Sequence, residues 1–273
     1  MQRVVFVLGH RGMLGSMVHR TLASAGSRVL TSDERYTGAP DDPLIRDVVR
    51  SEADSVVNCL GITTARKATD QSLLIANALL PMELAARLDG RTLIHASTDC
   101  VFDGRRGGYG LADHPNALDP YGLSKRLGEA CVVEPNVVVL RTSLVGPEAV
   151  TTRGLLAWFL SQTGPVDGWV DHRWNGITTL AWAELCIEIL SGARPLGPGL
   201  HQPTTTTAVS KYELLQMFAD AFGHRIEVRQ VRTDNPRDMT LVPTVPMPEL
   251  VVQLRELRAS VREHVVASSP PRG

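Results

Sequence analysis

The chain has 273 residues, 43% of them hydrophobic, and its formal charge of -1 reflects 28 Lys and Arg against 29 Asp and Glu. This length suits one large domain or a domain with a smaller cap, and the hydrophobic content excludes a disordered or fibrous chain. Because no basic run is interleaved with aromatic residues, nucleic-acid binding is not expected.

The sequence also contains no signal for a membrane or an oxidising compartment. No apolar stretch approaches the ~20 residues that span a bilayer, and the run VVFVLG ends at His10 and Arg11 without a cleavage site. The four cysteines lack C-x-x-C spacing and a histidine cluster, which predicts reduced thiols and no metal site: Cys59, Cys100, Cys131 and Cys186. A soluble cytoplasmic protein is therefore expected.

In the first 146 residues, short β-branched runs alternate with amphipathic segments. Strands are expected at 3–8, 28–32, 54–58, 92–97 and 137–142, and helices at 14–25, 42–51, 71–88 and 120–133. Pro81 should kink or break the third helix. Because the strands are continuous apolar runs, they predict a parallel sheet covered on both faces. Residues 1–146 are therefore expected to form an α/β, Rossmann-type, doubly wound cofactor-binding domain.

After residue 146 the pattern changes. Helices are expected at 152–161, 178–190, 210–222 and 247–262, between loops rich in Gly, Pro and Thr. We assign 147–265 to a smaller, mixed α/β substrate-binding region that closes over the sheet, some of whose segments could interleave with the first domain. Residues 266–273 (ASSPPRG with the preceding Val) are expected to be a disordered tail.

Four motifs each follow an expected strand: GHRGMLG, NCLG, STDC and RTSLVG. The carboxyl ends of parallel strands meet at one edge of the sheet, where such folds bind ligands. In the first motif the glycines Gly9, Gly12 and Gly15 have the spacing G-x-x-G-x-x-G, which lets backbone N–H groups and a helix N-terminus hold a pyrophosphate. An ordinary strand-to-helix turn is the alternative. Further cofactor contacts are expected from Arg11, Met13, Leu14, Cys59, Leu60 and Gly61.

The choice of cofactor depends on three charged residues. Asp33 is expected to end the second strand, where an acid usually bonds the ribose 2′-hydroxyl of NAD. Arg11 and Arg35 could instead hold the 2′-phosphate of NADP. Two arginines favour NADP(H), with NAD(H) as the alternative.

Tyr121 and Lys125, in PYGLSK, lie four residues apart and therefore on one helical face. A tyrosine with a pKa near 10 is a poor catalyst at neutral pH, and a neighbouring ammonium is expected to lower that pKa. The lysine could also bond the nicotinamide ribose. Thr98, with Ser97 as second choice, could hold the substrate oxygen against the phenol.

Together these motifs resemble the extended short-chain dehydrogenase/reductase superfamily. STDCVFDG followed by YGLSKRLGE is most similar to the dTDP-4-dehydrorhamnose reductase branch, whose pattern is STDYVFDG and then YGxTKxxGE. The resemblance covers about residues 3–225, including RWNGITTLAWAEL and SKYELLQMFA. It implies that Thr98 polarises the substrate, that Tyr121 is the acid and that Lys125 is its partner.

Two departures from the branch pattern concern the chemistry. Cys100 replaces the usual tyrosine, and a cysteine here with GHRGM also resembles GDP-fucose synthase, an epimerase and reductase. The histidine that such an enzyme carries in the first cap helix has no match in TRGLLAWFLSQ, although His172 could approach from a loop. Sugar dehydratases have an Asp-Glu pair where this chain has Asp99-Cys100, so dehydration is not expected.

Substrate contacts are expected from Thr98, Cys100, Arg153 and Trp174, the last because RWNG is read as a loop. Trp158, Trp169 and Asn175 are weaker candidates. The resulting hypothesis is an NADP(H)-preferring reductase of a nucleoside-diphosphate 4-keto-6-deoxy sugar. An epimerase or epimerase–reductase is the first alternative. A cofactor-binding subunit without turnover, like the regulatory subunit of methionine adenosyltransferase, is the second. A homo-oligomer is compatible with each.

Overall fold

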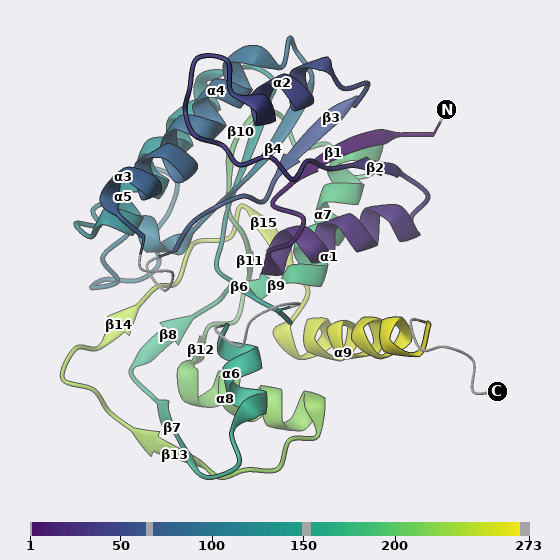
Figure 1. Ribbon diagram of the computed structural model, residues 1–273. Coiled ribbons are helices and arrows are strands. Elements are labelled where there is room, and N and C mark those ends of the chain that lie inside the picture. The colour runs from purple at the N-terminus through teal and green to yellow at the C-terminus, as the bar shows by residue number, and fades with distance from the viewer. Residues whose placement is uncertain (1, 64–67, 149–153, 268–273) are drawn as a thin grey trace.

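The computed structural model describes residues 2–63, 68–148 and 154–267. Its centre is a parallel sheet of six strands in the order β10-β5-β4-β3-β1-β2 (Figure 1). The strands are β1 (Val4–Leu8), β2 (Arg28–Leu30), β3 (Ser55–Asn58), β4 (Thr92–Ser97), β5 (Val137–Arg141) and β10 (Gly199–His201). The expected doubly wound α/β fold is thereby confirmed.

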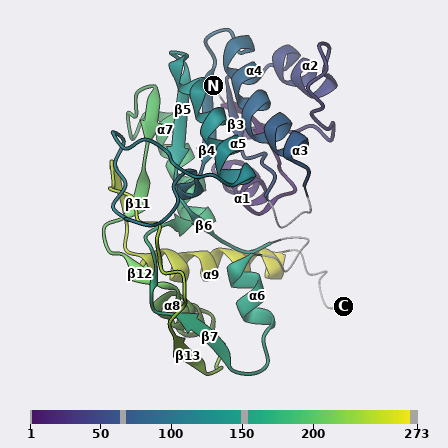
Figure 2. The same cartoon turned by 90° about the vertical axis from the view of Figure 1, so that its left-hand side faces the viewer.

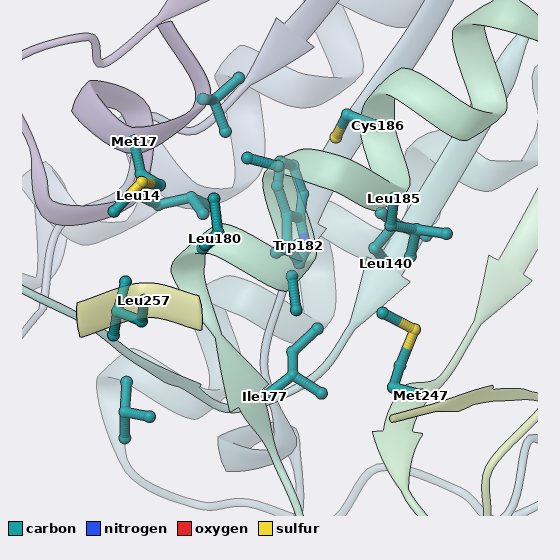
Figure 3. Close-up of a cluster of buried hydrophobic side chains, with 14 of the residues drawn as sticks. Leu14, Met17, Leu140, Ile177, Leu180, Trp182, Leu185, Cys186, Met247 and Leu257 are labelled. Atoms are coloured by element: carbon teal, nitrogen blue, oxygen red, sulfur yellow. The ribbon is translucent and has the colours of Figure 1, made fainter. Parts of the chain in front are cut away.

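Alternate residues of β1 bury their side chains in two separate cores. Val5 and Val7 join a cluster with α1 (Met13–Ser24) and α7 (Thr179–Ser191), while Phe6 and Leu8 join one with α2 (Pro43–Arg50). Figure 3 shows the first cluster, in which Leu14 and Met17 of α1 lie near Leu180 and Trp182 of α7. The strands are apolar throughout because both faces of the sheet are covered.

The long helix expected at 71–88 is broken as Pro81 predicts. It consists of α3 (Asp70–Leu74), a π-helical turn (Ile75–Leu79) and α4 (Leu80–Arg87), with Pro81 in the first turn of α4. A proline has no N–H to donate, and a π-helical turn widens the helix before it. In this turn, Asn77 accepts a hydrogen bond from Ile62 N and donates one to Ser124 Oγ, at 2.9 and 3.0 Å. The widened turn thus fixes the loop after β3 against the helix that carries Tyr121.

Apart from α7 and β10, most of the described chain beyond residue 146 forms small sheets and helices below the six-stranded sheet (Figures 1 and 2). The strand pairs are β6 (Leu144–Val145) with β9 (Ile177–Thr178), β7 (Val166–Trp169) with β13 (Val228–Val231), and β11 (Pro203–Thr205) with β15 (Val245–Met247). β8 (His172–Trp174) lies between β12 (Val209–Ser210) and β14 (Arg237–Asp238). The helices are α6 (Leu155–Ser161), α8 (Lys211–Phe222) and α9 (Leu250–Ala267).

Several boundaries differ from expectation. β10 and α7 lie after residue 146 but belong to the central sheet and its covering layer, so the chain crosses between the two regions more than once. β2 ends at Leu30, three residues before Asp33. α9 continues to Ala267, past the residue where the tail was expected to begin, and 268–273 lie outside the described residues. None of the helices in the described part of the chain is long and apolar enough to cross a membrane.

Candidate active site

A pocket of about 680 Å³ opens at the carboxyl ends of β1, β3, β4 and β5. Its walls are the loop after β1, the loop after β3, the turn after β4, the helix α5 (Pro120–Gly128) and residues 142–146. Most of the expected cofactor and catalytic residues line it: Arg11, Gly12, Met13, Leu14, Cys59, Leu60, Gly61, Thr98, Cys100, Tyr121 and Lys125. The fold therefore gathers motifs more than a hundred residues apart in sequence around one cavity.

The glycine loop has the geometry of a dinucleotide cradle. Gly9 has φ +74°, and a Cβ there would lie 2.9 Å from Leu60 N, while a Cβ on Gly15 would collide with Gly9 O. Helix α1 begins after Gly12 with no side-chain cap and no acidic residue in its first turn. Its first N–H groups and its positive dipole end are thus available to an anion, so these residues fit the pyrophosphate of a nicotinamide dinucleotide.

Arg11, which favours NADP, and Asp33, which favours NAD, are in contact with each other. Arg11 Nη2 lies 2.6 Å from Asp33 Oδ1, and both side chains are largely exposed. His10 Nε2 lies 3.5 Å from the same oxygen, and partial burial lowers the pKa of His10. Arg35 is exposed and does not line the pocket. An NADP phosphate and Asp33 would therefore compete for Arg11.

Lys125 is buried beneath the pocket, with 5% of its surface exposed, and its Nζ donates a 2.7 Å hydrogen bond to Ala96 O. Burial lowers the pKa of this ammonium to about 8, and the nearby carboxylate of Glu129 opposes the shift. Helix α5 begins at Pro120, where Asp119 accepts a hydrogen bond from Gly122 N at 3.0 Å. The cap orients the first turn of the helix, and with it Tyr121.

Tyr121 differs from expectation in its ionisation. Burial raises its pKa, the charges of Cys100 and Asp99 add to this effect, and a hydrogen bond with Thr98 opposes it. The expected lowering by Lys125 is not found, because desolvation dominates and the ammonium is bonded to Ala96 O. Tyr121 is therefore a protonated phenol at neutral pH, which is the form that can donate a proton.

Thr98 caps the single 3₁₀ turn Asp99–Val101 that follows β4. Its Oγ1 accepts a hydrogen bond from Cys100 N at 3.2 Å and donates one to Asp99 Oδ1 at 3.1 Å. The second-choice hydroxyl, that of Ser97, donates to Glu129 Oε1 at 2.6 Å. With its proton committed to a buried carboxylate, Ser97 is the poorer candidate to hold a substrate oxygen.

A buried ion pair behind Lys125 was not singled out from the sequence. Arg141 bonds both carboxylate oxygens of Glu129, at 2.8 and 2.6 Å, and Gln202 Oε1 at 3.1 Å. Arg141 is 2% and Glu129 8% exposed. Both residues belong to motifs noted in the sequence, because Glu129 ends YGLSKRLGE and Arg141 begins RTSLVG. The sequence alone does not show that they form a pair.

Cys100 lines the pocket beside Thr98, and its Sγ lies 3.5 Å from Asp99 Oδ1. Burial raises the pKa of this thiol, as do the charges of Asp99 and Asp119. Proton exchange by a cysteine requires a lowered pKa. The surroundings of Cys100 raise its pKa instead, so they do not favour proton exchange by this thiol.

Several expected substrate contacts lie away from the pocket. Trp174 belongs to strand β8 rather than to a loop, and it is 2% exposed because it packs in the large hydrophobic core. Asn175 uses its amide to bond Thr205 O and Leu241 O and N. His172, also in β8, bonds Thr233 and lies against Trp169. Trp158 is partly exposed on α6, and Arg153 lies outside the described residues.

These features define a doubly wound α/β fold with a glycine loop at a helix N-terminus and a tyrosine–lysine pair, Tyr121 and Lys125, on the same pocket. Residues 2–239 match the family model described as the RmlD substrate binding domain, and the chain belongs to this family. The resemblance to the dTDP-4-dehydrorhamnose reductase branch is thereby confirmed.

The relatives include both reductases and a subunit of another enzyme. A probable low-salt glycan biosynthesis reductase, Agl14, of Haloferax volcanii is 37% identical over 51% of this chain and 53% of that protein. The dTDP-4-dehydrorhamnose reductase of Burkholderia thailandensis is 32% identical over 48% and 45%. The alignment thus spans about half the length of these two relatives. Methionine adenosyltransferase 2 subunit beta of Danio rerio is 27% identical over 81% of this chain and 74% of that protein.

Solved structures agree on the fold. The dTDP-4-dehydrorhamnose reductase of Bacillus anthracis in complex with NADP has a TM-score of 0.80 at 19% identity, covering 95% of this chain and 100% of that one. MoeE5 in complex with UDP-glucose and NAD has a TM-score of 0.70 at 19% identity, covering 96% and 99%. Structural neighbours in complex with NADP and with NAD thus share this architecture.

Proposed function

We propose that this chain is an NADPH-preferring reductase that transfers hydride to the C4 carbonyl of a 4-keto-6-deoxy sugar carried on a nucleoside diphosphate. The observation that carries the proposal is the convergence of Thr98, Tyr121 and Lys125 with the glycine cradle on one pocket. Membership in the RmlD family and the relatives named as reductases support the sugar substrate.

The bound nicotinamide would supply the hydride, and the chain's own residues supply binding and the proton. The first N–H groups of α1 hold the pyrophosphate, and the ammonium of Lys125 holds the ribose. Tyr121 delivers the phenolic proton to the substrate oxygen as that oxygen becomes an alkoxide, a general-acid step. The raised pKa of Tyr121 keeps the proton available throughout the neutral range. Thr98 holds the phenol in position.

The preference for NADPH rests on Arg11 within the glycine loop and on Arg35. Arg11 is paired with Asp33 at 2.6 Å. The doubly charged 2′-phosphate of NADP would be a stronger partner for the Arg11 guanidinium and would displace Asp33 from it. The alternative is NADH, in which case Asp33 would bond the free ribose hydroxyl.

The direct test is a screen of the purified chain against nucleoside-diphosphate 4-keto-6-deoxy sugars, following loss of NADPH absorbance. Turnover of at least one sugar that depends on Tyr121 is expected. Binding of NADPH without turnover of any sugar in the series would contradict the proposal.

A second candidate has a specific observation in its favour. The alignment with methionine adenosyltransferase 2 subunit beta covers 81% of this chain, more than the 48% and 51% for the two reductases. In this alternative the chain binds NADP and a methionine adenosyltransferase catalytic subunit without turning over a sugar. Copurification with such a subunit, together with a negative sugar screen, would favour it.

A further inference from the structure

His10 is the second residue of the glycine loop GHRGMLG, between Gly9 and Arg11. Its side chain is 21% exposed, and its Nε2 lies 3.5 Å from Asp33 Oδ1. Its ring centroid lies 6.5 Å from that of His19 on α1. A largely buried imidazole therefore lies close both to helix α1 and to the carboxylate that follows β2.

Asp33 Oδ1 has two basic neighbours, of which one is always charged. Arg11 Nη2 lies 2.6 Å from this oxygen, and His10 Nε2 lies 3.5 Å from the same atom. A guanidinium keeps its charge across the whole neutral range, whereas an imidazole is a cation only after it takes up a proton. While His10 is neutral, Asp33 therefore pairs with Arg11. Once His10 is protonated, two cations compete for one oxygen.

The surroundings of His10 place its titration in mildly acidic solution. Burial lowers its pKa from the ordinary value of 6.5, the charge of Asp33 opposes this effect, and the charges of Arg11 and His19 add to it. These groups face the ring from its own loop, from α1 and from the segment after β2. His10 is therefore mainly neutral at neutral pH and becomes a cation as the solution is acidified.

We propose that His10 makes cofactor selectivity depend on pH: a protonated His10 takes Asp33 from Arg11, and the released guanidinium binds the 2′-phosphate of NADP. The same step weakens binding of NAD, because a carboxylate that is bonded to an imidazolium is a poorer acceptor for the ribose 2′-hydroxyl. Both effects favour NADP over NAD in acid. The inference rests on the proposed function, which places a nicotinamide dinucleotide at the glycine loop.

The 2′-phosphate of NADP titrates in a similar range and has to be separated from His10. A phosphate monoester takes up its second proton at about pH 6, which weakens its attraction to an arginine. This effect opposes the proposed one, but it is a property of the cofactor and is common to all variants of the chain. A comparison between variants at the same pH therefore isolates the contribution of His10.

The contact between His10 and Asp33 is tested first without any cofactor. The ring proton of His10 is followed by ¹H NMR against pH in the full chain and assigned by its loss in His10→Gln. Asp33→Asn should lower the midpoint by about half a unit or more, because the protonated ring loses an opposite charge that solvent partly screens. His19→Gln, which removes the neighbouring ring, should not lower it. An unchanged midpoint in folded Asp33→Asn overturns the inference.

Selectivity is then measured by calorimetry with NADP⁺ and NAD⁺ from about pH 5.5 to about pH 8, on both sides of the ordinary histidine pKa. The affinity ratio of NADP⁺ to NAD⁺, divided by the ratio for His10→Gln at the same pH, should rise about two- to fivefold toward acid, because exposed ion pairs such as Arg11–Asp33 are weak. His19→Gln should follow the wild type. Near-UV circular dichroism shows that each variant is folded.

The route through Asp33 is tested in a second background. When Asp33→Asn is already present, adding His10→Gln should leave the affinity ratio unchanged at every pH. A normalised ratio that is flat in the wild type, or one that rises equally in the Asp33→Asn background, overturns the inference. If neither cofactor binds at any pH, the proposed function itself fails, and this inference fails with it.

Discussion

Lys125 Nζ donates a 2.7 Å hydrogen bond to the carbonyl of Ala96, the penultimate residue of β4. The bond fixes the ammonium under the pocket but leaves it poorly solvated, and its pKa falls to about 8. A residue with a normal value of 10.5 thus titrates close to physiological pH. Cofactor affinity and the free energy of unfolding should therefore both depend on pH near this value.

We expect NADPH affinity to fall as pH rises through about 8, because Lys125 then loses the charge that holds the ribose. Isothermal titration calorimetry from about pH 6.5 to about pH 9.5, on both sides of this midpoint, would measure the change in affinity. Lys125→Met should bind weakly at every pH. An affinity that is flat across this range in the wild type would contradict the role given to the ammonium.

The same burial should make Lys125→Met more stable than the wild type. The folded pKa is depressed, so between pH 8 and 10.5 the unfolded state binds more protons, and the stability of the wild type rises with pH. Below pH 8 the cost of burying the charge is fully present, at about 3 kcal/mol for a shift of this size. Urea unfolding at pH 7 and pH 10 should show the advantage of Lys125→Met shrinking as pH rises.

Tyr121→Phe tests the proton donor. The variant should keep its fold and its NADPH affinity but lose turnover by about 10²–10⁴-fold, as is typical of general acid–base groups. Stopped-flow and steady-state assays with the accepted sugar measure the loss, and NADPH titration serves as the control. Turnover close to wild type in a folded variant would remove Tyr121 from the chemistry.

Glu129→Gln should be costly in two ways. It leaves Arg141 buried with a weaker partner, and breaking a buried pair by removing one charge costs about 3–5 kcal/mol. It also removes the carboxylate that raises the pKa of Lys125, so the pH at which NADPH affinity declines should move downward. Urea unfolding and calorimetry measure the two effects separately. An unchanged affinity profile would show that Glu129 acts on stability alone.

Cys100→Ser distinguishes simple reduction from epimerisation. Because burial and nearby acids raise the pKa of the thiol, we expect the variant to retain most of its activity. Product formed by the wild type in D₂O should carry no deuterium at the carbons beside the carbonyl. Deuterium at either carbon that disappears in Cys100→Ser would instead support the epimerase–reductase alternative.

Cofactor choice is tested on both sides of the Arg11–Asp33 pair. The wild type should bind NADPH more tightly than NADH, and Arg35→Ala should narrow the difference. Asp33→Asn should widen it, by roughly tenfold, because it frees Arg11 for a charge-assisted bond to the phosphate. Equal affinities in the wild type would favour NADH and the role of Asp33 at the ribose.

The sequence by itself determined the features that are local or periodic. The apolar strands predicted the parallel sheet, Pro81 predicted the break before α4, and glycine spacing predicted the turn into α1. Each of these follows from backbone conformation or from a repeat over a few residues. The motif order was also enough to indicate the family.

Tertiary structure decided what depends on burial and on partners distant in the chain. β10 is only three residues long, which is too short for a periodic pattern in the sequence. It forms a strand because it pairs in parallel with the edge of β5. The sequence predicted Trp174 in a loop, but in the structure it belongs to β8, which pairs with β12 and β14 on its two sides. Lys125 does not lower the pKa of Tyr121, because its ammonium is buried and bonded to Ala96 O. Arg11 is not free to bind a phosphate, because it is paired with Asp33. Neither contact follows from the spacing of residues in the sequence. Desolvation and charge pairing are properties of three-dimensional neighbours, and only the folded chain brings those neighbours together.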